Sequence, residues 1–534
     1  MVQTPEPTAA EPMYLEVNTP SATQDLRNPL SSDPLAKKTS IPAFSPTWML
    51  YASVFVAWML PFQFGWSISQ VNLSTFANQD DCDARPVVDG TCLMFPGHSK
   101  TEWIFVVNSW IVGGMVGSLT CGSVADKIGR KKVLMTSALF MIAGGAIQAA
   151  SNSVRVFVAG RLVAGVASGI ATGLVGGYIN EIAPPHLRNS LGIGLQISLS
   201  TGILLVVCTF FFANTSSGWR YIAGFPIVWG GVVLVLASFL LVESPAWLLN
   251  NGKRDEAAKV MAQLYGEEHV NLAFSWLEPP ASASDIETPR TGSGEHGIEH
   301  VELPVESTLS QLISPLFRRQ LIVAIGVASA QQLSGVNAVF YYSSSFFQDA
   351  GISDDRIGSV IVNAMNLVPT FFVGHLASRY GNRNILLFGL AGMFVSAVGM
   401  TVALTTGVSA LSIVFTALYV GFFALSLGPL IYVVTADLFP DTVRASACSI
   451  CIFFNYLSNL VVGVSFPYIA DALDDFSFLP FIVILALFLL FTFKMVPETV
   501  GKSSDEIQAE FRALRETNAP SSPLSSDRSQ AFGN

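Results

Sequence analysis

Long apolar segments, each about 20 residues, recur along most of the chain and are separated by polar stretches. A segment of that length crosses a hydrocarbon core of about 30 Å as an α-helix. Because backbone amides in lipid must be paired within the segment, we interpret these segments as membrane-spanning helices. The alternative, a barrel of short strands, requires alternating polarity, which these segments lack. We predict twelve spans, near 47–70, 101–124, 133–151, 155–181, 189–213, 219–242, 319–348, 356–378, 384–406, 409–437, 444–470 and 476–496.

Polar stretches divide the chain. One lies at 73–100, and a longer one follows the sixth span. In the longer stretch, Ala257, Val260, Met261 and Leu264 share one helical face, whereas 279–304 is rich in Ser, Gly, Pro and Glu. We therefore predict a disordered tail at 1–45, a six-helix bundle at 46–242, a linker with short helices and a disordered part at 243–318, a second bundle at 319–497 and a tail at 498–534.

The composition agrees with a membrane protein. Hydrophobic residues make up 51% of the chain and charged residues 12%, whereas soluble proteins carry about 25% charged residues. Lys and Arg form no stripe or run, which argues against nucleic-acid binding. The spans contain no Ser/His/Asp or metal-ligand cluster, so we predict neither an enzyme nor a metal or cofactor site. The sequence makes no prediction of oligomeric state.

Basic residues predict the orientation. Near the span ends, only Arg85, Lys100, Arg155, Arg220 and Arg356 fall on one side, and the other side is much richer in Lys and Arg. By the positive-inside rule the richer side is cytoplasmic. We therefore expect both termini and the central linker to be cytoplasmic, in a protein of the plasma membrane.

The stretch 73–100 then lies outside the cell. A disulfide between Cys82 and Cys92 is expected there, and two free thiols are the alternative, because six cysteines give no unique pairing. Asn72-Leu73-Ser74 and Asn214-Thr215-Ser216 are glycosylation sequons on the same side. Both lie close to the predicted membrane edge.

Three short motifs recur in the two bundles. Acid-x-x-Pro-x-x-x-Arg occurs at Glu181–Arg188 and again at Asp437–Arg444, 256 residues later (437 − 181). The segment 122–130 matches 374–382 with an offset of 252 (374 − 122), and Glu243 matches Glu498 with an offset of 255 (498 − 243). This shared register predicts an all-α membrane protein of twelve helices in two pseudo-symmetric bundles, the architecture of many secondary transporters.

Charged side chains gather at the cytoplasmic ends of these spans. Opposite charges there are expected to pair when the inner mouth is closed and to separate when it opens. Each such pair is worth about 0–1 kcal/mol, so a network would be needed. The alternative is topology anchoring by positive charge alone. The gating candidates are Asp126, Arg130, Lys131, Glu181, Arg188, Glu243, Asp437, Arg444 and Glu498, with Tyr341 and Tyr342 of span seven.

Uncharged amides stand in otherwise apolar spans. In span seven, an unwound turn at Gly335 would bring Gln331 and Asn337 together. Amides offer both donors and acceptors, which suits a neutral polyol better than an ion. Pairing between helices is the alternative. Further polar candidates for the binding site are Gln332, Ser334, Gln196, Asn363, Asn366, Asn455 and Asn459, and the aromatic candidates are Phe340, Tyr341, Tyr342, Tyr432 and Tyr456. We predict that Gly428-Pro429 breaks the helix of span ten. Arg161 lies within an apolar segment, and the sequence assigns it no partner.

These motifs resemble the sugar porter family of the major facilitator superfamily, near facilitative glucose and fructose transporters. The resemblance covers about residues 45–505 and rests on Gln331–Tyr342, Phe62–Trp66, Gly129–Lys131, Gly160–Leu162, Glu243–Pro245 and Pro497–Thr499. It implies that the linker forms an inner helical bundle. It also implies that Gln196, Gln331, Gln332, Asn337, Asn363 and Asn459 hydrogen-bond the sugar.

The chain departs from the family pattern in spans one and ten, and in the second-half basic motif, where Ser378 and Asn382 stand. Proton-coupled members carry an acid in span one, around the position of Ser67, whereas span one here has none. Because an intramembrane carboxylate is the usual proton carrier, we expect a uniporter. In span ten, Ala424 and Tyr432 stand in the region where the family usually has a glutamate and a tryptophan. We therefore expect facilitated transport of a hexose; the alternatives are a proton-coupled sugar symporter and a non-transporting sugar sensor.

Overall fold

The structure is a computed structural model that describes residues 44–77, 82, 86, 92–277, 308–349, 354–502 and 504–516. Within these residues the secondary structure is helical and contains no strand. The predicted N-terminal tail up to residue 43 and the linker part 278–307 lie outside the described residues. Eleven of the described helical segments are long and apolar enough to cross a membrane, and Leu479–Met495 is a shorter apolar helix. The all-α, twelve-span prediction is confirmed.

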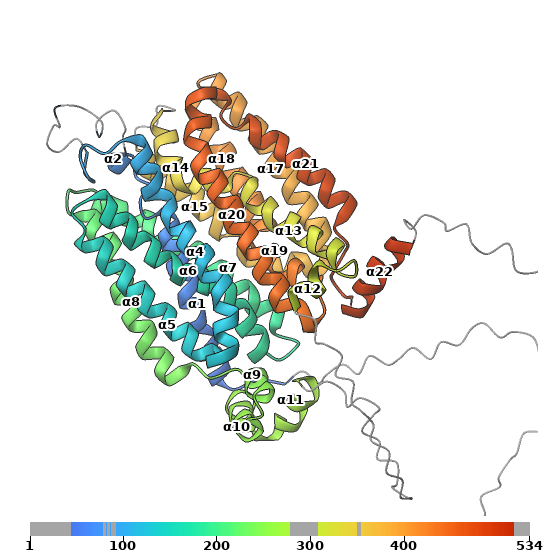
Figure 1. Cartoon of the computed structure of the whole chain (residues 1–534). Helices are drawn as coiled ribbons and strands as arrows, with labels where there is room; N and C mark the ends of the chain where they lie inside the picture. The colour runs from blue at the N-terminus through green and yellow to red at the C-terminus, as the bar shows by residue number, and fades with distance from the viewer. Residues whose placement is uncertain are drawn as a thin grey trace, which may run out of the picture. The chain divides into compact units, whose positions relative to one another are not determined.

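The first half contains six long helices. They are α1 (Trp48–Ser69), α4 (Lys100–Ile128), α5 (Arg130–Ala150), α6 (Val154–Ile182), α7 (Arg188–Ala213) and α8 (Gly218–Leu240), with the short α2 (Ser74–Ala77) after α1 (Figure 1). Ser99 begins α4 with a capping box, because its hydroxyl accepts from the Glu102 amide while the Glu102 carboxylate accepts from the Ser99 amide. Gly129, with φ of +99°, separates α4 from α5.

The second half has broken spans. Its helices are α13 (Arg318–Leu333), α14 (Val336–Asp349), α15 (Asp355–Leu367), η3 (Pro369–Phe372), α16 (Val373–Tyr380), α17 (Asn382–Thr405), α18 (Ser409–Leu425), α19 (Leu427–Asp437), α20 (Asp441–Leu473), η4 (Asp474–Phe476) and α21 (Leu479–Met495). Span seven breaks at Gly335, whose φ is +90°, as predicted. Span ten breaks at Ser426, so Gly428 and Pro429 lie in the first turn of α19.

The two halves use equivalent packing pairs. In the first half α1 packs on α7, and α5 packs on α6 and α8; in the second half α13 packs on α20, and α17 packs on α18 and α21. Figure 1 shows the first half in blue to green and the second in yellow to red. The halves meet where α4 packs on α20 and α7 packs on α15. Two pseudo-symmetric bundles are therefore present, as the sequence repeat predicted.

Helices α4 and α6 cross with almost no space between their backbones. A Cβ atom at Gly165 would lie 2.0 Å from the Trp110 carbonyl oxygen, and one at Gly169 would lie 2.1 Å from the Gly114 carbonyl oxygen. Only glycine fits at such contacts, which are common between membrane helices. This crossing fixes α4, which also contacts the second half.

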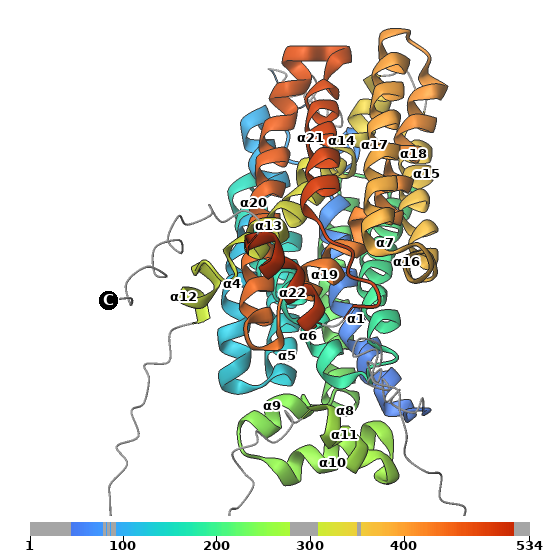
Figure 2. The ribbon, with the colours of Figure 1, turned by 90° about the vertical axis from the view of Figure 1, so that its right-hand side faces the viewer.

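Short helices follow the sixth span and gather at one end of the first half (Figures 1 and 2). They are α9 (Pro245–Asn250), α10 (Arg254–Tyr265), η1 (Glu267–His269) and α11 (Val270–Leu277); α12 (Thr308–Ile313) precedes α13, and α22 (Ser504–Glu516) follows α21. As predicted, Ala257, Met261 and Leu264 are buried on one face of α10. The Tyr265 hydroxyl donates to the Ile182 carbonyl at 2.8 Å, which attaches α10 to the end of α6.

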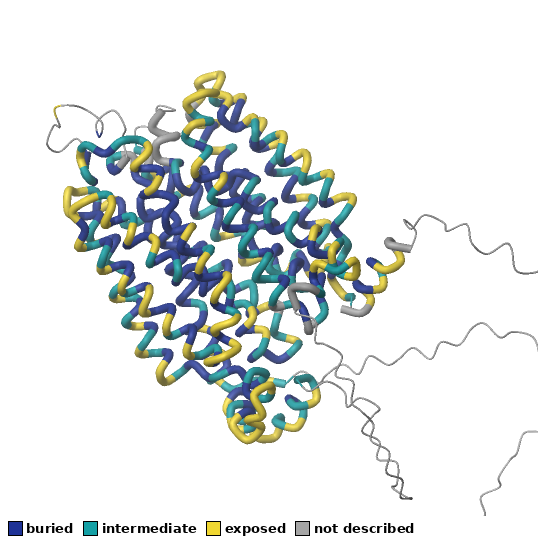
Figure 3. Tube along the Cα trace, viewed as in Figure 1, coloured by how far each residue is buried: buried dark blue, intermediate teal, exposed yellow. Residues whose placement is uncertain are grey.

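We call the end with α9–α11 the basic face, and the end where α4 begins and α20 finishes the opposite face. Burial increases from the periphery towards the centre (Figure 3). Large apolar side chains stay exposed on the outside of the helices; Phe212 is 76% exposed and Phe239 is 77% exposed. Such extensive apolar exposure is expected of a surface that faces lipid.

Candidate functional site

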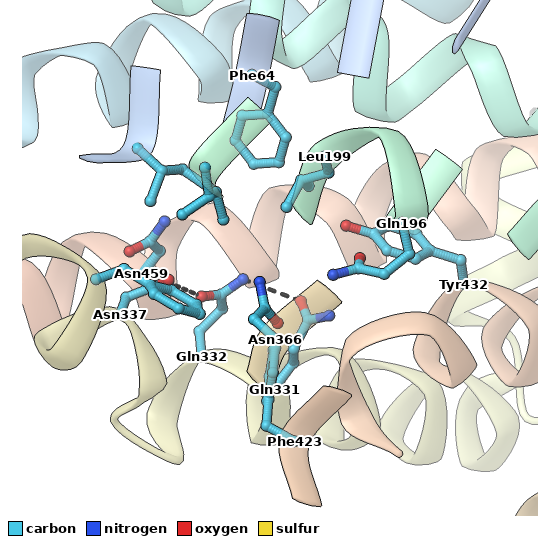
Figure 4. Close-up of a pocket in the computed structure, with 13 residues that line it drawn as sticks. Phe64, Gln196, Leu199, Gln331, Gln332, Asn337, Asn366, Phe423, Tyr432 and Asn459 are labelled. Carbon is cyan, nitrogen blue, oxygen red and sulfur yellow. Dashed lines mark hydrogen bonds between the residues drawn. The ribbon is translucent and has the colours of Figure 1, made fainter. Parts of the chain in front are cut away.

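A cavity lies between the two halves. The first half contributes a mainly apolar wall, and the second half contributes most of the polar groups (Figure 4). The lining residues are Phe64, Ile68, Gln196, Leu199 and Ile203 from the first half, and Gln331, Gln332, Asn337, Phe340, Asn366, Phe423, Tyr432 and Asn459 from the second. All of them are uncharged, so the cavity suits a neutral polar molecule with an apolar side.

The amides of α13 and α14 form one network. Gln331 Nε2 donates to the carbonyl oxygens of Leu427 at 3.0 Å and Gly428 at 2.8 Å, at the start of α19. Gln332 Nε2 donates to Gln331 Oε1 at 3.0 Å, and Asn337 Nδ2 donates to Gln332 Oε1. The break at Gly335 thus brings Gln331, Gln332 and Asn337 together, as expected from the sequence.

Asn455 lies behind this network on α20. Its Nδ2 donates to Gln331 Oε1 at 2.8 Å, and its Oδ1 accepts from Gln332 Nε2 at 2.8 Å. Asn455 is not one of the described residues that line the cavity. Asn455 therefore positions the two glutamines, because it fixes which atoms of each amide remain available to a ligand.

The predicted gating tyrosines lie beside the cavity and away from the basic face. Tyr341 OH donates to Asn459 Oδ1 at 2.8 Å, and Tyr342 OH donates to the Gly463 carbonyl at 3.0 Å. Both bonds hold α14 against α20. Tyr341 is buried, so it contributes to the wall behind Asn459.

Span eight carries two candidate amides, of which the structure places one at the cavity; a sugar contact of Asn363 stays a prediction. The resemblance implied Asn363, but Asn366, one helical turn further along, lines the cavity. Asn363 is 1% exposed, and its Nδ2 donates to the Ser359 carbonyl at 2.7 Å. Asn366 Nδ2 donates to Ser200 Oγ of α7 at 3.2 Å. An apolar span with two amides three residues apart does not show which one faces the partner half, because both lie on the same broad side of the helix.

Hydrogen bonds join the halves near the opposite face. Ser69 Oγ donates to the Phe340 carbonyl at 3.0 Å, and Asn108 Nδ2 donates to the Gly463 carbonyl at 3.1 Å. Lys100 pairs with Asp471 at the ends of α4 and α20. The cavity is therefore closed on this side by contacts that must break if it is to open there. Sequence reasoning missed Asn108, although an amide in an apolar span was the available signal.

The sequon asparagines differ in exposure. Asn72 is 2% exposed, and its Nδ2 donates to Ser343 Oγ of α14 at 2.9 Å. A buried amide in the contact between halves leaves no space for a glycan in this conformation, and glycosylation at Asn72 stays a prediction. Asn214 is half-buried and accepts from Thr75 Oγ1 at 2.7 Å.

Cys82 and Cys92 are paired as a disulfide, with Cα atoms 5.0 Å apart.

Two of the ion pairs at the basic face share Arg130. Arg130 Nε lies 3.0 Å from Glu181 Oε2, and Arg130 Nη1 lies 3.0 Å from Asp126 Oδ1. They join α4, α5 and α6, all in the first half. Neither pair joins the two halves in this conformation, and the role of these residues in gating stays a prediction.

The predicted gating glutamates hold helix starts instead. Glu243 Oε1 accepts from the backbone amides of Arg130 at 2.7 Å and Lys131 at 3.2 Å. Glu498 does the same for α17, accepting from the amides of Asn382 at 2.8 Å and Arg383 at 3.2 Å. A carboxylate is favourable there because the first amides of a helix lack partners and carry partial positive charge. The repeat therefore encodes two equivalent helix anchors.

The repeated arginines close helix ends. Arg188 Nε donates to the Ala183 carbonyl at 3.1 Å, and Arg444 Nε donates to the Ala436 carbonyl at 3.0 Å. Cations favour the carbonyl-rich C-terminal end of a helix, here the ends of α6 and α19. Asp437 is the last residue of α19. Lys131 Nζ donates to the Ser238 carbonyl at 3.4 Å.

Arg161, which lacked a predicted partner, binds backbone carbonyls. Its side chain is 1% exposed and donates to the carbonyls of Val106 at 3.0 Å, Val107 at 2.9 Å and Ser67 at 3.0 Å. The Trp110 ring centroid lies 5.9 Å from the guanidinium. Carbonyl dipoles therefore stabilise this buried charge.

Comparisons with known proteins agree with this architecture. The family model described as "Sugar (and other) transporter" matches residues 53–511. Human "Solute carrier family 2, facilitated glucose transporter member 4" is 33% identical over 480 residues, which cover 87% of this chain and 91% of the relative. "Glucose transporter GlcP" of Staphylococcus epidermidis is 32% identical over 437 residues, which cover 80% of this chain and 93% of the relative.

Solved structures show the same fold. The major facilitator superfamily proton:xylose symporter XylE bound to 6-bromo-6-deoxy-D-glucose superposes with a TM-score of 0.70, at 22% identity, over 87% of this chain and 99% of that chain. An inward open conformation of the xylose transporter XylE from E. coli gives a TM-score of 0.66, at 22% identity, over 86% of this chain and 99% of that chain. With its two matching halves, amide-lined cavity and family match, the chain belongs to the Sugar (and other) transporter family, the sugar porters of the major facilitator superfamily.

Proposed function

We propose that this protein carries a hexose, such as glucose or fructose, across a membrane by facilitated diffusion. The observation that supports this most directly is the cavity between the halves, in which amides of the second half face apolar side chains of the first. Amides can replace the water that surrounds sugar hydroxyls, because they donate and accept. The apolar wall suits the C–H faces of a sugar ring.

Uniport is favoured by the absence of a proton carrier beside the cavity. None of the described lining residues is an acid, and α1 carries no acid either. At the place where a carboxylate would face Arg161, the Ser67 carbonyl accepts its bond. A carrier without a carboxylate on the substrate path lacks the usual group that couples a proton to the sugar. The curated relatives named above as glucose transporters agree with the substrate class.

We assign the basic face to the cytoplasm, by the positive-inside rule, and the protein to the plasma membrane. Both termini and the linker are then cytoplasmic. The Cys82–Cys92 pair would lie in an oxidising environment, which favours its bridge, and Asn214 remains a glycosylation candidate. The closed opposite face would be the outer face.

Uptake into proteoliposomes tests the proposal. Labelled glucose, fructose, galactose and xylose are offered with and without an inward proton gradient. Downhill uptake of a hexose that ignores the gradient is expected. Acceleration by the gradient would establish symport instead, and saturable sugar binding without uptake would establish a sensor.

A matched variant sharpens this test. Ser67→Asp introduces a carboxylate into α1, at the residue whose backbone carbonyl accepts from Arg161. Its uptake is expected to become dependent on pH, while the wild type stays insensitive over the same range. A wild-type rate that already follows a carboxylate titration would contradict uniport.

A further inference from the structure

Two cations at the opposite face lie over aromatic rings of the other half. Lys100 begins α4 in the first half, and its Nζ lies 5.9 Å from the centroid of the Tyr468 ring of α20. Arg356 lies in the first turn of α15 in the second half, and its guanidinium carbon is 5.1 Å from the centroid of the Phe211 ring of α7. Both distances are within the range of about 6 Å at which a cation and a ring attract each other. We call these two contacts the cation–ring pairs.

The cation–ring pairs are related by the internal repeat. Arg356 follows Lys100 by 256 residues (356 − 100), and Tyr468 follows Phe211 by 257 residues (468 − 211). The repeated acid-x-x-Pro-x-x-x-Arg motif has the same offset of 256. Each cation lies at the start of the second span of its half, and each ring lies near the end of the fifth span. The pseudo-symmetry of the bundles therefore places one pair at the contact of α4 with α20 and the other at the contact of α7 with α15.

Carboxylates hold both cations in place. Lys100 pairs with Asp471 of α20, so this cation contacts the other half through a carboxylate as well as a ring. Arg356 binds Asp354 of its own half, with Nε 2.8 Å from Oδ1 and Nη2 3.0 Å from Oδ2. A planar guanidinium that is bound along one edge by a carboxylate can still stack on a ring. Asp354 therefore supports the contact of Arg356 with α7.

The location of the cation–ring pairs favours one conformation. The cation–ring contacts of Arg161 and Arg383 stay within one half, so a movement of one half against the other leaves them unchanged. Lys100 and Arg356 instead join the halves at the opposite face, which is closed in this conformation. Opening of that face would separate both pairs. A contact that is present in one conformation and lost in the other shifts the equilibrium towards the first.

We propose that the two cation–ring pairs together hold the opposite face closed and so set the fraction of molecules that are open to that face. This inference goes beyond the proposed function, since it applies to any substrate that the cavity carries. One exposed cation–ring contact changes an equilibrium by about two- to fivefold. Both pairs separate in the same movement, so the loss of both should raise a small open fraction by about five- to thirtyfold if they act independently.

Thiol labelling measures the open fraction without any substrate. Asn108→Cys, in the contact between α4 and α20, is the reporter, and a membrane-impermeant methanethiosulfonate is added to the opposite face. The same proteins without Asn108→Cys give the background. Phe211→Leu and Tyr468→Leu remove the rings but keep the charge of the protein, so the electrostatic attraction of the reagent is unchanged. We expect each variant to label about two- to fivefold faster than the reporter alone, and the two combined about five- to thirtyfold faster.

Matched variants separate the role of the ring from that of the site. Phe211→Tyr and Tyr468→Phe keep the rings and should label at the rate of the reporter alone. Phe212→Leu changes a neighbouring ring that is 76% exposed, and its rate should also stay unchanged. An unchanged rate in either Phe211→Leu or Tyr468→Leu, or an equal increase in Phe212→Leu, would overturn the proposal. Because no sugar is present, this outcome does not depend on whether the wild type carries a hexose.

A double-mutant cycle tests the contact of Arg356 with Phe211 directly. Arg356→Met also loses the bond to Asp354, so its own labelling rate combines two effects. In that background the Phe211 ring has already lost its cation, and adding Phe211→Leu should leave the rate unchanged. Beside Arg356 the same substitution should raise the rate by about two- to fivefold. An increase of the same size in both backgrounds would show that the ring acts through packing alone and would contradict a cation–ring pair. Thermal unfolding checks that each variant is folded.

Discussion

Replacing Gln332 by alanine removes the centre of the amide network. The side chain donates to Gln331 Oε1 and Asn455 Oδ1 and accepts from Asn337 Nδ2. Gln331 Oε1 keeps its bond from Asn455, so Asn455 Oδ1 and Asn337 Nδ2 are the two atoms that lose the bond described. A net hydrogen bond is worth about 0.5–1.5 kcal/mol, and an orphaned buried group costs about 1–3 kcal/mol. Because Gln332 borders a cavity, water replaces part of this loss.

The remaining loss for a bound sugar is about 1.4–2.8 kcal/mol, which corresponds to a ten- to hundredfold fall in kcat/KM. The assay is the initial rate of labelled hexose uptake into proteoliposomes. Gln320→Ala is the matched control, because Gln320 is buried on the same helix but donates to Gln508 Oε1 at 2.6 Å, away from the cavity. Thermal unfolding checks that both variants are folded. A folded Gln332→Ala protein with kcat/KM within twofold of wild type would refute the assigned role.

Three further predictions concern the scaffold. Glu243→Ala should destabilise the first half by about 1–3 kcal/mol, because the first amides of α5 lose their acceptor; an unchanged Tm in detergent would contradict the helix-anchor role. Gly165→Val should abolish folded expression, since even a Cβ atom would lie 2.0 Å from a carbonyl oxygen, and normal surface levels would exclude the close crossing. Lys100→Glu should favour opening at the opposite face by about 0–1 kcal/mol, measured as faster thiol labelling of Asn108→Cys in the contact between the halves, with the Asp471→Lys exchange restoring the wild-type rate; equal rates in single and double variants would argue against a role of this ion pair in closing that face.

The sequence predicted the architecture because membrane helices are set by length and apolarity. All twelve spans were located to within a few residues, and the break at Gly335 followed from one glycine in a polar turn. The repeated Glu243 and Glu498 indicated duplication correctly. Their contacts were not predicted, because a carboxylate at a span end serves equally as an ion-pair partner or as an acceptor for helix amides, and only the chain path decides.

The sequence predicted which types of residue form the site better than it predicted which residue of a span faces the cavity. Gln331, Gln332 and Asn337 were expected together, and the structure places them in one network. Which amide of span eight meets the cavity, Asn366 or Asn363 one turn away, could not be predicted, because the side of α15 that meets the cavity depends on how the halves pack. Contacts between halves, such as that of Asn72 with Ser343, have no local signature, since the partners are 271 positions apart.

Counterflow tests the central claim, that a single cavity takes up a hexose and is exposed alternately to the two faces. Proteoliposomes are loaded with unlabelled glucose, diluted into a trace of labelled glucose and given no ion gradient. The account predicts a transient accumulation of label above equilibrium that is lost in Gln332→Ala and kept in Gln320→Ala. Label that rises only to equilibrium, with or without internal sugar, would contradict it.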